Sequence, residues 1–194
     1  YRLHSAYHRH FVFGLLAVMF HDHIRSVNTN IALPDGYYFR NFKDGDQEIW
    51  AGIETAAGEF SSVDKALKRF TDEFSGFESE LQSRCFFLCD SNDRVIGTSM
   101  GWYGKEVSEE IIGRLHWVAI HPDYQGRKLG KALVARALKR IQQSHARAYL
   151  TSRTTNWKAI NMYLDFGFKP LYTTPDCEKA WHLLAKKLNR DIGS

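Results

Sequence analysis

The sequence has little cysteine and no strong excess of charge of either sign. Only three of its 194 residues are cysteine, and no two of them have the two-residue spacing of zinc or redox motifs. This excludes the disulfide framework of small secreted proteins and makes a reducing cytoplasm the expected compartment. Lysine and arginine number 26 against 22 acidic residues, for a net charge of +4. That balance permits anionic ligands but does not require nucleic acid, which we regard as disfavoured.

Long apolar runs are also missing. The longest, Phe11–Phe20, is well short of the ~20 residues that cross a bilayer, so no membrane association is expected. His21, Asp22 and His23 follow it where a signal peptide has small residues before its cleavage site, which disfavours a secretion signal. We therefore predict that Phe11–Phe20 forms a buried or interface helix.

Turn-forming residues between Asn28 and Gly36 mark one boundary in the chain. They predict an N-terminal extension with an apolar helix over residues 1–34 and a single compact domain over residues 35–194. Apolar spacing within the domain predicts helices that begin near residues 46, 61, 130 and 156. It also predicts strands over residues 37–42, 84–89, 95–103, 111–120, 148–152, 168–172 and 181–185. Helices that interleave with a mixed sheet indicate the α/β or α+β class.

The segment Val118–Ala132 carries the strongest chemical signal. A strand runs into a glycine-containing loop, and the loop opens a long amphipathic helix. Backbone N–H groups in the first turn of a helix lack intrahelical partners and lie at the positive end of the dipole, so phosphate oxygens bind there. Gly126 and Gly130 let the backbone approach an anion closely. Three basic side chains add positive charge around the glycines: Arg127, Lys128 and Lys131.

The spacing of the glycines excludes two common phosphate motifs. Only three residues separate Gly126 from Gly130, and Ala132 stands where a Walker A loop needs a hydroxyl, so ATP and GTP are disfavoured. The dinucleotide-binding fingerprint of three glycines is absent as well. From spacing alone, a solvated loop in front of a surface helix is an equal alternative.

The same segment resembles the acetyl-coenzyme A binding motif of the GNAT superfamily of N-acetyltransferases. Gln125 and Gly130 match the first and last positions of its Gln/Arg-X-X-Gly-X-Gly/Ala pattern, whereas Lys128 replaces the usual first glycine. We expect lysine to be tolerated there because a helical backbone conformation is open to it. A second block, Asn156–Phe168, is similar to the family's pattern of Asn, Ala, an aliphatic–Tyr pair and Gly-Phe.

The resemblance covers about Gly36 to Leu188 and implies a fold. That fold has a mixed, mostly antiparallel central sheet flanked by helices, with two central strands that splay apart. It also implies a reaction, in which an acetyl group passes from acetyl-CoA to a primary amine on a small molecule or peptide. The amine attacks directly in a ternary complex, and coenzyme A is the co-product.

The resemblance assigns roles to individual residues. Val118 and Ile120 pair with the pantetheine arm through their main chains, and the Val118 N–H stabilises the tetrahedral intermediate. Tyr163 is the implied general acid that protonates the departing thiolate. Asn156 meets the cofactor at the start of its helix, where it is also a good N-cap. The full set of implied cofactor-binding residues is Val118, Ile120, Gln125, Gly126, Arg127, Lys128, Leu129, Gly130, Lys131 and Asn156.

The acceptor amine must also lose a proton. For a lysine-like amine at pH 7 this costs about 4.6 kcal/mol, so a base is expected. The resemblance does not fix its position, and Glu109, Glu110 and His116 are the candidates.

Other interpretations stay open. A domain of this fold can serve as a non-catalytic acyl-CoA sensor or as a nucleic-acid-binding module, and it can be a monomer or a homodimer. The alternating histidines near the start of the chain are interpreted as solvent-facing or tag-like, so no metal is expected. They are His8, His10, His21 and His23.

Overall fold

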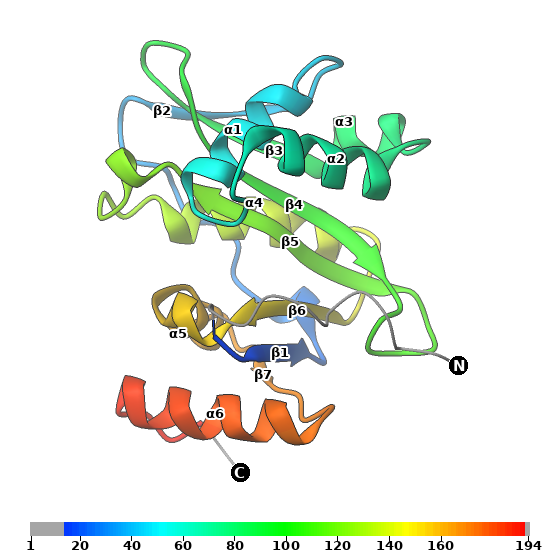
Figure 1. Cartoon of the computed structure of the whole chain (residues 1–194), viewed down its shortest axis with the longest axis vertical. Coiled ribbons are helices and arrows are strands. Elements are labelled where there is room, and N and C mark those ends of the chain that lie inside the picture. The colour runs from blue at the N-terminus through cyan, green and yellow to red at the C-terminus, as the bar shows by residue number, and fades with distance from the viewer. Residues whose placement is uncertain (1–13, 193–194) are drawn as a thin grey trace. The chain divides into compact units, whose positions relative to one another are not determined.

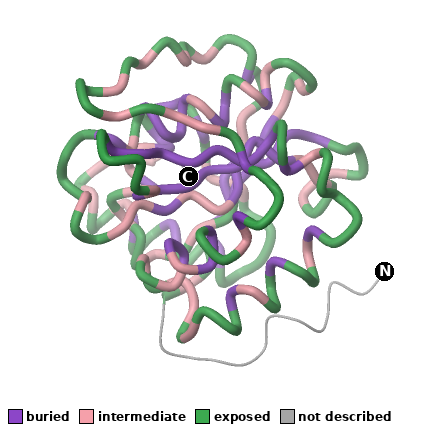
Figure 2. Tube along the Cα trace, turned by 90° about the horizontal axis from the view of Figure 1, so that it is seen from above, coloured by how far each residue is buried: buried purple, intermediate pink, exposed green. Residues whose placement is uncertain are grey.

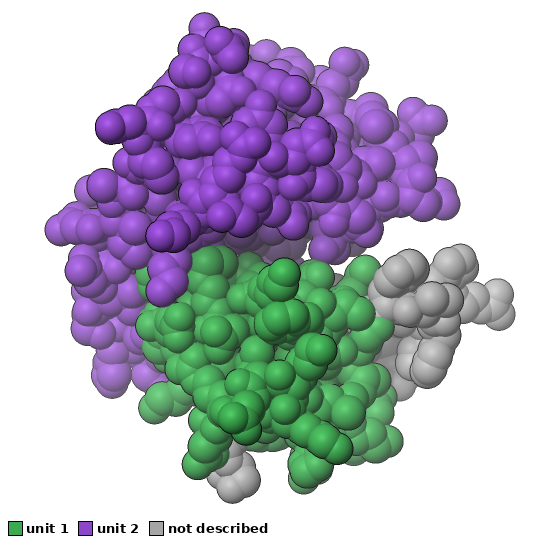
Figure 3. All heavy atoms as spheres, turned by 90° about the vertical axis from the view of Figure 1, so that its left-hand side faces the viewer, with its two compact units in different colours: residues 1–20, 150–194 green, residues 21–149 purple. Residues whose placement is uncertain are grey.

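The computed structural model describes residues 14–192. The chain divides into two compact units, which Figure 3 distinguishes by colour. Unit 1 comprises residues 1–20 and 150–194, and unit 2 comprises residues 21–149. The division at residue 34 stays a prediction, because the two units are cut at other points of the chain.

Unit 2 is built on a sheet of consecutive antiparallel strands. Its strands pair in the order β2-β3-β4-β5. The first two residues of β6 (Ala148–Arg153) pair in parallel with Gly113 and Arg114 of β5. The strands and helices of unit 2 are β2 (Tyr37–Asn41), α1 (Gln47–Ala56), α2 (Val63–Phe74), α3 (Glu78–Arg84), β3 (Cys85–Asp90), β4 (Val95–Gly104), β5 (Ile112–Ile120) and α4 (Gly130–Gln142), with short 3₁₀ turns at Ile24–Ser26 and Pro122–Tyr124.

Helices cover both faces of this sheet. Figure 1 shows α1 and α2 in front of β4 and β5, with α4 behind them. Buried aromatic side chains, including Trp50 and Phe70, fill the layer on the α1–α2 face. On the other face α4 packs closely, and a Cβ added at Gly101 would lie 2.6 Å from the carbonyl oxygen of Ala137. The glycine therefore permits this approach of helix and strand. Figure 2 shows continuous buried stretches of chain as well as exposed ones, and all six residues of β3 are buried.

Unit 1 contains the remainder of β6 and β1 (Leu16–His21) up to Phe20, with η3 (Thr154–Asn156), α5 (Trp157–Asp165), β7 (Lys169–Pro170) and α6 (Pro175–Leu188). Strand β1 pairs antiparallel with β7 through Met19 and Phe20.

The predicted fold class is confirmed. The strands form a mixed, mostly antiparallel sheet, and helices pack against it. Strand β5 has nine residues. Its parallel register with β6 includes two of them, Gly113 and Arg114, which lie near the start of β5.

The prediction of a helix over Phe11–Phe20 is wrong for the part that the structure describes. Residues 14 to 20 contain the start of strand β1, whose neighbours Ala17, Val18 and Met19 are all buried. A strand covered on both faces reads as a continuous apolar run, and periodicity cannot separate it from a buried helix. Residues 11–13 lie outside the described residues.

The C-terminal strand predicted over residues 181–185 is also wrong, because these residues lie in α6. Thr174 caps this helix by accepting a hydrogen bond from the Cys177 N–H, and Pro175 occupies its first turn. Helix α3 was not predicted. The strand expected over residues 168–172 is reduced to Lys169–Pro170.

Candidate active site

The loop between β5 and α4 turns on two residues with left-handed backbone. Gly126 has a φ of +78° and Lys128 a φ of +62°. The expectation that position 128 is helical is therefore wrong: it has the conformation that glycine adopts freely and a side chain strains. Successive N–H groups around left-handed residues form a concave nest that binds anions.

The N–H groups of the loop are divided between internal and outward-facing donors. The Gln125 N–H donates to the Pro122 carbonyl at 3.1 Å and so serves the turn itself. The N–H groups of Gly126 to Gly130, by contrast, donate no hydrogen bond within residues 14–192. Unpaired donors in a loop before the first turn of a helix are the groups that phosphate oxygens bind, which makes this loop a candidate anion site.

Side-chain contacts fix the loop in place. Gln125 Nε2 donates to the carbonyl of Ile120 at 3.0 Å, which ties the loop to the end of β5. Arg127 Nη2 donates to the Asp123 carbonyl at 2.9 Å. The guanidinium carbon of Arg127 also lies 4.6 Å from the centre of the Tyr124 ring. Leu129 is buried, whereas the side chains of Lys128 and Lys131 are exposed. Two ammonium groups thus border the nest.

Strand β5 carries a bulge immediately before the loop. Three residues of β5 oppose two of β4, because Met100 pairs with His116 while Thr98 pairs with Ala119. Trp117 lies at the irregularity with a φ of +45°, rare for a bulky residue. Val118, the second residue of the bulge, and Ile120 beyond it both pack against the α4 side of the sheet.

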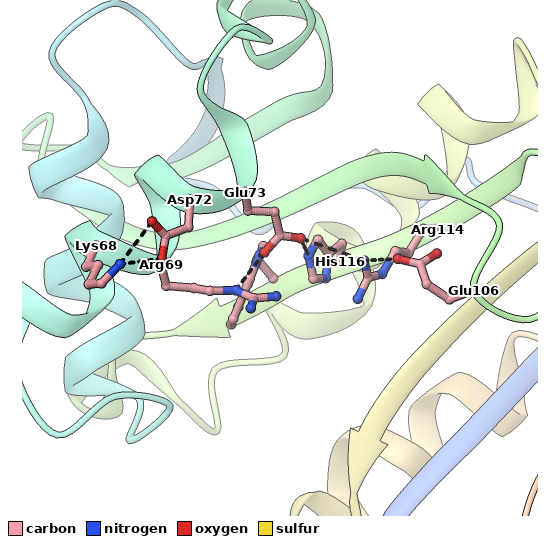
Figure 4. A network of polar contacts seen from close by, with 8 residues as sticks. Lys68, Arg69, Asp72, Glu73, Glu106, Arg114 and His116 are labelled. Carbon is pink, nitrogen blue, oxygen red and sulfur yellow. Dashed lines mark hydrogen bonds and ion pairs between the residues drawn. The ribbon is translucent and has the colours of Figure 1, made fainter. Parts of the chain in front are cut away.

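The bulge turns two consecutive side chains toward one carboxylate. His116 and Trp117 both contact Glu73 of α2, although neighbours in a regular strand point to opposite faces. His116 Nε2 lies 2.5 Å from Glu73 Oε1, and Trp117 Nε1 donates to Oε2 at 3.3 Å. Figure 4 shows Glu73 directed from its helix toward His116 and Arg114. Arg69 Nε donates to Oε2 at 2.9 Å, and Arg114 lies 3.7 Å from Oε1.

These contacts set the charge of both partners. Burial raises the pKa of Glu73, but the hydrogen bond and charge of His116, with the charges of Arg69 and Arg114, outweigh it and leave the pKa well below its usual range. Burial, followed by the charge of Arg114, lowers the pKa of His116 to about 4. At pH 7 Glu73 is therefore ionised and His116 is neutral.

The other two predicted bases are placed differently. Glu110 is exposed and forms an ion pair with Arg147, and Glu109 is also exposed. Of the three candidates, His116 alone is buried beside a carboxylate. Sequence reasoning missed Glu73, since its spacing from Arg69 reads as an ordinary surface pair on one helix.

The remaining predicted site residues belong to unit 1. Tyr163 lies on α5 and is 6% exposed. Asn156 occupies the N-cap position of α5, but its side chain makes no capping hydrogen bond, so the predicted cap is wrong in that respect.

Among residues 14–192, no group of three or more His, Cys, Asp or Glu side chains is arranged to hold a metal ion. In the same range, every helix falls short of the length or the apolar character that crossing a membrane requires.

Comparison with known proteins places this loop and strand in context. The model of the Acetyltransferase (GNAT) family matches residues 48–168, which include α1, the bulged strand, the loop and α5. The chain belongs to the GNAT acetyltransferase family. Members of this family generally use acetyl-CoA, and the nest and its lysines fit the diphosphate of that molecule.

Relatives known from sequence are acetyltransferases. A mycothiol acetyltransferase of Pseudarthrobacter chlorophenolicus is 29% identical over 151 residues, which cover 71% of this chain and 44% of that protein. The corresponding protein of Streptomyces coelicolor is 29% identical over 138 residues, covering 70% and 44%. The chain thus spans less than half the length of these relatives.

Solved structures share the fold. A GCN5-related N-acetyltransferase from Sphaerobacter thermophilus superposes with a TM-score of 0.63 at 16% identity, over 82% of this chain and 49% of that one. A tandem GNAT protein from the clavulanic acid biosynthesis pathway gives a TM-score of 0.57 at 14% identity, over 81% and 50%.

Proposed function

We propose that this GNAT domain transfers an acetyl group from acetyl-CoA to a primary amine by direct attack in a ternary complex. The observation that carries the proposal is the loop between β5 and α4, with its outward N–H groups from Gly126 to Gly130. These donors suit the diphosphate of coenzyme A. Lys128 and Lys131 add the positive charge that a ligand with a diphosphate and a 3′-phosphate requires.

Strand β5 and helix α5 carry the proposed reacting groups. The Val118 N–H lies within the bulge and is the proposed donor to the oxyanion of the tetrahedral intermediate. The main chains of Val118 and Ile120 are the proposed partners of the pantetheine arm. Tyr163 is the proposed general acid for the departing thiolate, with Asn156 as a further cofactor contact.

The acceptor is an amine-bearing small molecule or peptide, and the proposed enzyme works in the cytoplasm as a monomer or homodimer. The family and the acetyltransferase relatives support acetyl transfer. The amine class of the acceptor, the use of acetyl-CoA and the residue roles are our proposal for this chain.

Coenzyme A titration followed by an activity assay tests the function. We expect binding of coenzyme A by calorimetry and consumption of acetyl-CoA with at least one member of a panel of amines, polyamines and peptide N-termini. Tyr163→Phe should lower kcat by about 10²-fold and leave coenzyme A affinity unchanged, because the lost proton donor acts after binding.

Two outcomes would contradict the proposed function, and a third would remove one residue role. Tight coenzyme A binding without turnover of any amine would indicate an acyl-CoA sensor. Salt-dependent binding of DNA without affinity for coenzyme A would indicate a nucleic-acid-binding module. An unchanged kcat in Tyr163→Phe would remove the assigned acid alone.

A further inference from the structure

We propose that Asp90 and Tyr124 form a tether that holds the loop between β5 and α4 in the shape that binds coenzyme A. Tyr124 ends the short turn Pro122–Tyr124, and Asp90 is the last residue of β3, 34 positions earlier in the chain. Both are positioning residues, because they act on the ligand through the loop. The inference rests on the proposed function and gives the turn between β3 and β4 a part in cofactor affinity.

The tether is a hydrogen bond from a phenol to a carboxylate. The Tyr124 hydroxyl donates to Asp90 Oδ2 at 2.7 Å. The other carboxylate oxygen, Oδ1, accepts the N–H groups of Asn92 and Arg94 at 2.9 and 3.1 Å. The hydrogen bond from Tyr124 lowers the pKa of Asp90, so the carboxylate is ionised at neutral pH. One ionised acceptor, only 8% exposed, therefore orders the turn and attaches the loop to it through a strong class of hydrogen bond.

Other contacts fix the Tyr124 ring. The ring packs against the core cluster that contains Leu129. The guanidinium carbons of Arg127 and Arg94 lie 4.6 and 5.8 Å from the ring centre, within the range of cation–π attraction. Arg127 also donates to the hydroxyl of Tyr37, on β2, at 3.3 Å. Side chains from β2, from the end of β3 and from the turn after β3 thus converge on the loop.

The anchored residue stands directly before the candidate anion site. Tyr124 precedes Gly126 by two positions, and Gly126 is the first of the residues whose N–H groups face outward. Within residues 14–192 these N–H groups donate no hydrogen bond that would hold their directions. Glycine also leaves the backbone free to turn. The shape of the nest therefore depends on side-chain contacts at its ends, and Tyr124 supplies one of them.

An anchored loop binds more tightly because a larger fraction of the molecules is ready to bind. The apparent Kd equals the intrinsic Kd divided by that fraction. If loss of the tether reduces the fraction from nearly one to about one tenth, the Kd rises about tenfold. Acetyl transfer after binding is unaffected, so kcat keeps its value.

The charge of Asp90 distinguishes positioning from simple electrostatics. A carboxylate bonded to this loop repels an anionic ligand, so electrostatics alone predicts that its removal tightens coenzyme A binding. Positioning predicts the opposite, because loss of the carboxylate releases Tyr124. The two explanations thus give opposite signs for one substitution.

Removal of one hydroxyl group tests the tether. We expect Tyr124→Phe to raise the Kd for coenzyme A, measured by calorimetry, and the KM for acetyl-CoA about tenfold each. With the amine that the parent acetylates, kcat at saturating acetyl-CoA should stay within twofold of the parent. A purely structural role would lower the amount of active protein, and so kcat, without this shift in KM.

The matched control is Tyr38→Phe. It deletes another phenol–carboxylate hydrogen bond, from Tyr38 to Asp93 at 2.6 Å, in the same turn but without contact to the loop. Its Kd for coenzyme A should stay within twofold of the parent.

A double substitution tests whether Asp90 is the partner through which Tyr124 acts. Asp90→Ala should also raise the Kd for coenzyme A. Tyr124→Phe added to Asp90→Ala should then change the Kd by less than twofold, because the tether is already lost. If Asp90→Ala does not fold, the comparison of Tyr124→Phe with Tyr38→Phe decides alone.

The outcomes separate this inference from the proposed function. A parent that binds coenzyme A, together with a Tyr124→Phe variant whose Kd rises less than threefold, would overturn the tether and leave the proposed function in place. An equal loss of affinity in Tyr38→Phe, or tighter binding in a folded Asp90→Ala variant, would do the same. A parent without affinity for coenzyme A overturns both.

Discussion

Glu54 on α1 is buried and Glu73 on α2 is half-buried, and the two lie on the same side of the sheet in opposite surroundings. Neither carboxylate oxygen of Glu54 has a hydrogen-bond partner, and burial, followed by the charge of Glu59, raises its pKa well above 4.5. Glu73 is 14% exposed at its side chain but contacts two arginines, His116 and Trp117. Burial alone therefore does not set the charge of a glutamate here; the partners do.

The two glutamates should differ most in how the free energy of unfolding changes when each is replaced by glutamine. We expect Glu73→Gln to lower the free energy of unfolding by about 3 kcal/mol, because Arg69 and Arg114 lose their charge partner in a mostly buried site. Glu54→Gln should not lower it at pH 7, since the amide is neutral without taking up the proton that the buried carboxyl must hold. Urea unfolding at pH 7 measures both values, and equal losses would show that the two sites do not differ.

The next effect concerns Glu54 and pH. Its folded pKa is raised, so above pH 4.5 the native state holds a proton that the unfolded chain has released, and stability falls as pH rises toward the folded pKa. Replacement by methionine removes this fall and an unsatisfied acid, which should stabilise the protein by about 1–2 kcal/mol at pH 7. The measurement is the difference in unfolding free energy between the parent and Glu54→Met from pH 5 to 9.

The unfolding free energy of Glu54→Met is subtracted from that of the parent because His116 and Glu73 change stability with pH in the opposite direction to Glu54. Their pKa values are lowered, so they add stability as pH rises, Glu73 up to 4.5 and His116 between about 4 and 6.5. The two contributions cancel in the difference between the parent and Glu54→Met. A difference that does not grow with pH would contradict the raised pKa of Glu54.

The smallest expected effect is the loss of stability when Arg69, the partner of Glu73 on α2, is replaced. Arg69 is 45% exposed at its side chain and solvent screens its ion pair, so Arg69→Ala should cost only about 0.5–1 kcal/mol. Lys68→Ala, which breaks the exposed pair with Asp72 one residue earlier, should cost less than about 0.5 kcal/mol. Thermal unfolding at low and high salt compares them, and a loss of several kcal/mol for Arg69→Ala would place the main support of Glu73 on α2 instead of β5.

The sequence predicted most elements of unit 2 because their patterns are local. The apolar spacing of α1, α2 and α4 and the turn residues between β3 and β4 appear within short windows. Glu54 could have been noticed too, since it follows Trp50 by four residues and so lies on the apolar stripe of α1.

The failures have physical reasons as well. A buried strand such as β1 has no period of its own, and α6 was missed although Thr174, Pro175 and the lysines of its last turn are helix signals. The contact of Glu73 with His116 depends on how α2 crosses β5 and on a one-residue bulge, and no local pattern encodes either. The left-handed backbone at Lys128 could not be deduced from a side chain that disfavours it.

Lys128 makes this position one where stability and ligand binding favour different residues. Glycine at 128 would relieve the backbone by about 1 kcal/mol and would also complete the glycine pattern of the family motif. The same replacement would delete an ammonium group from the rim of the nest. Glycine at position 128 therefore favours thermal stability, and lysine favours ligand affinity. A screen for thermal stability alone would select glycine and lose the cation.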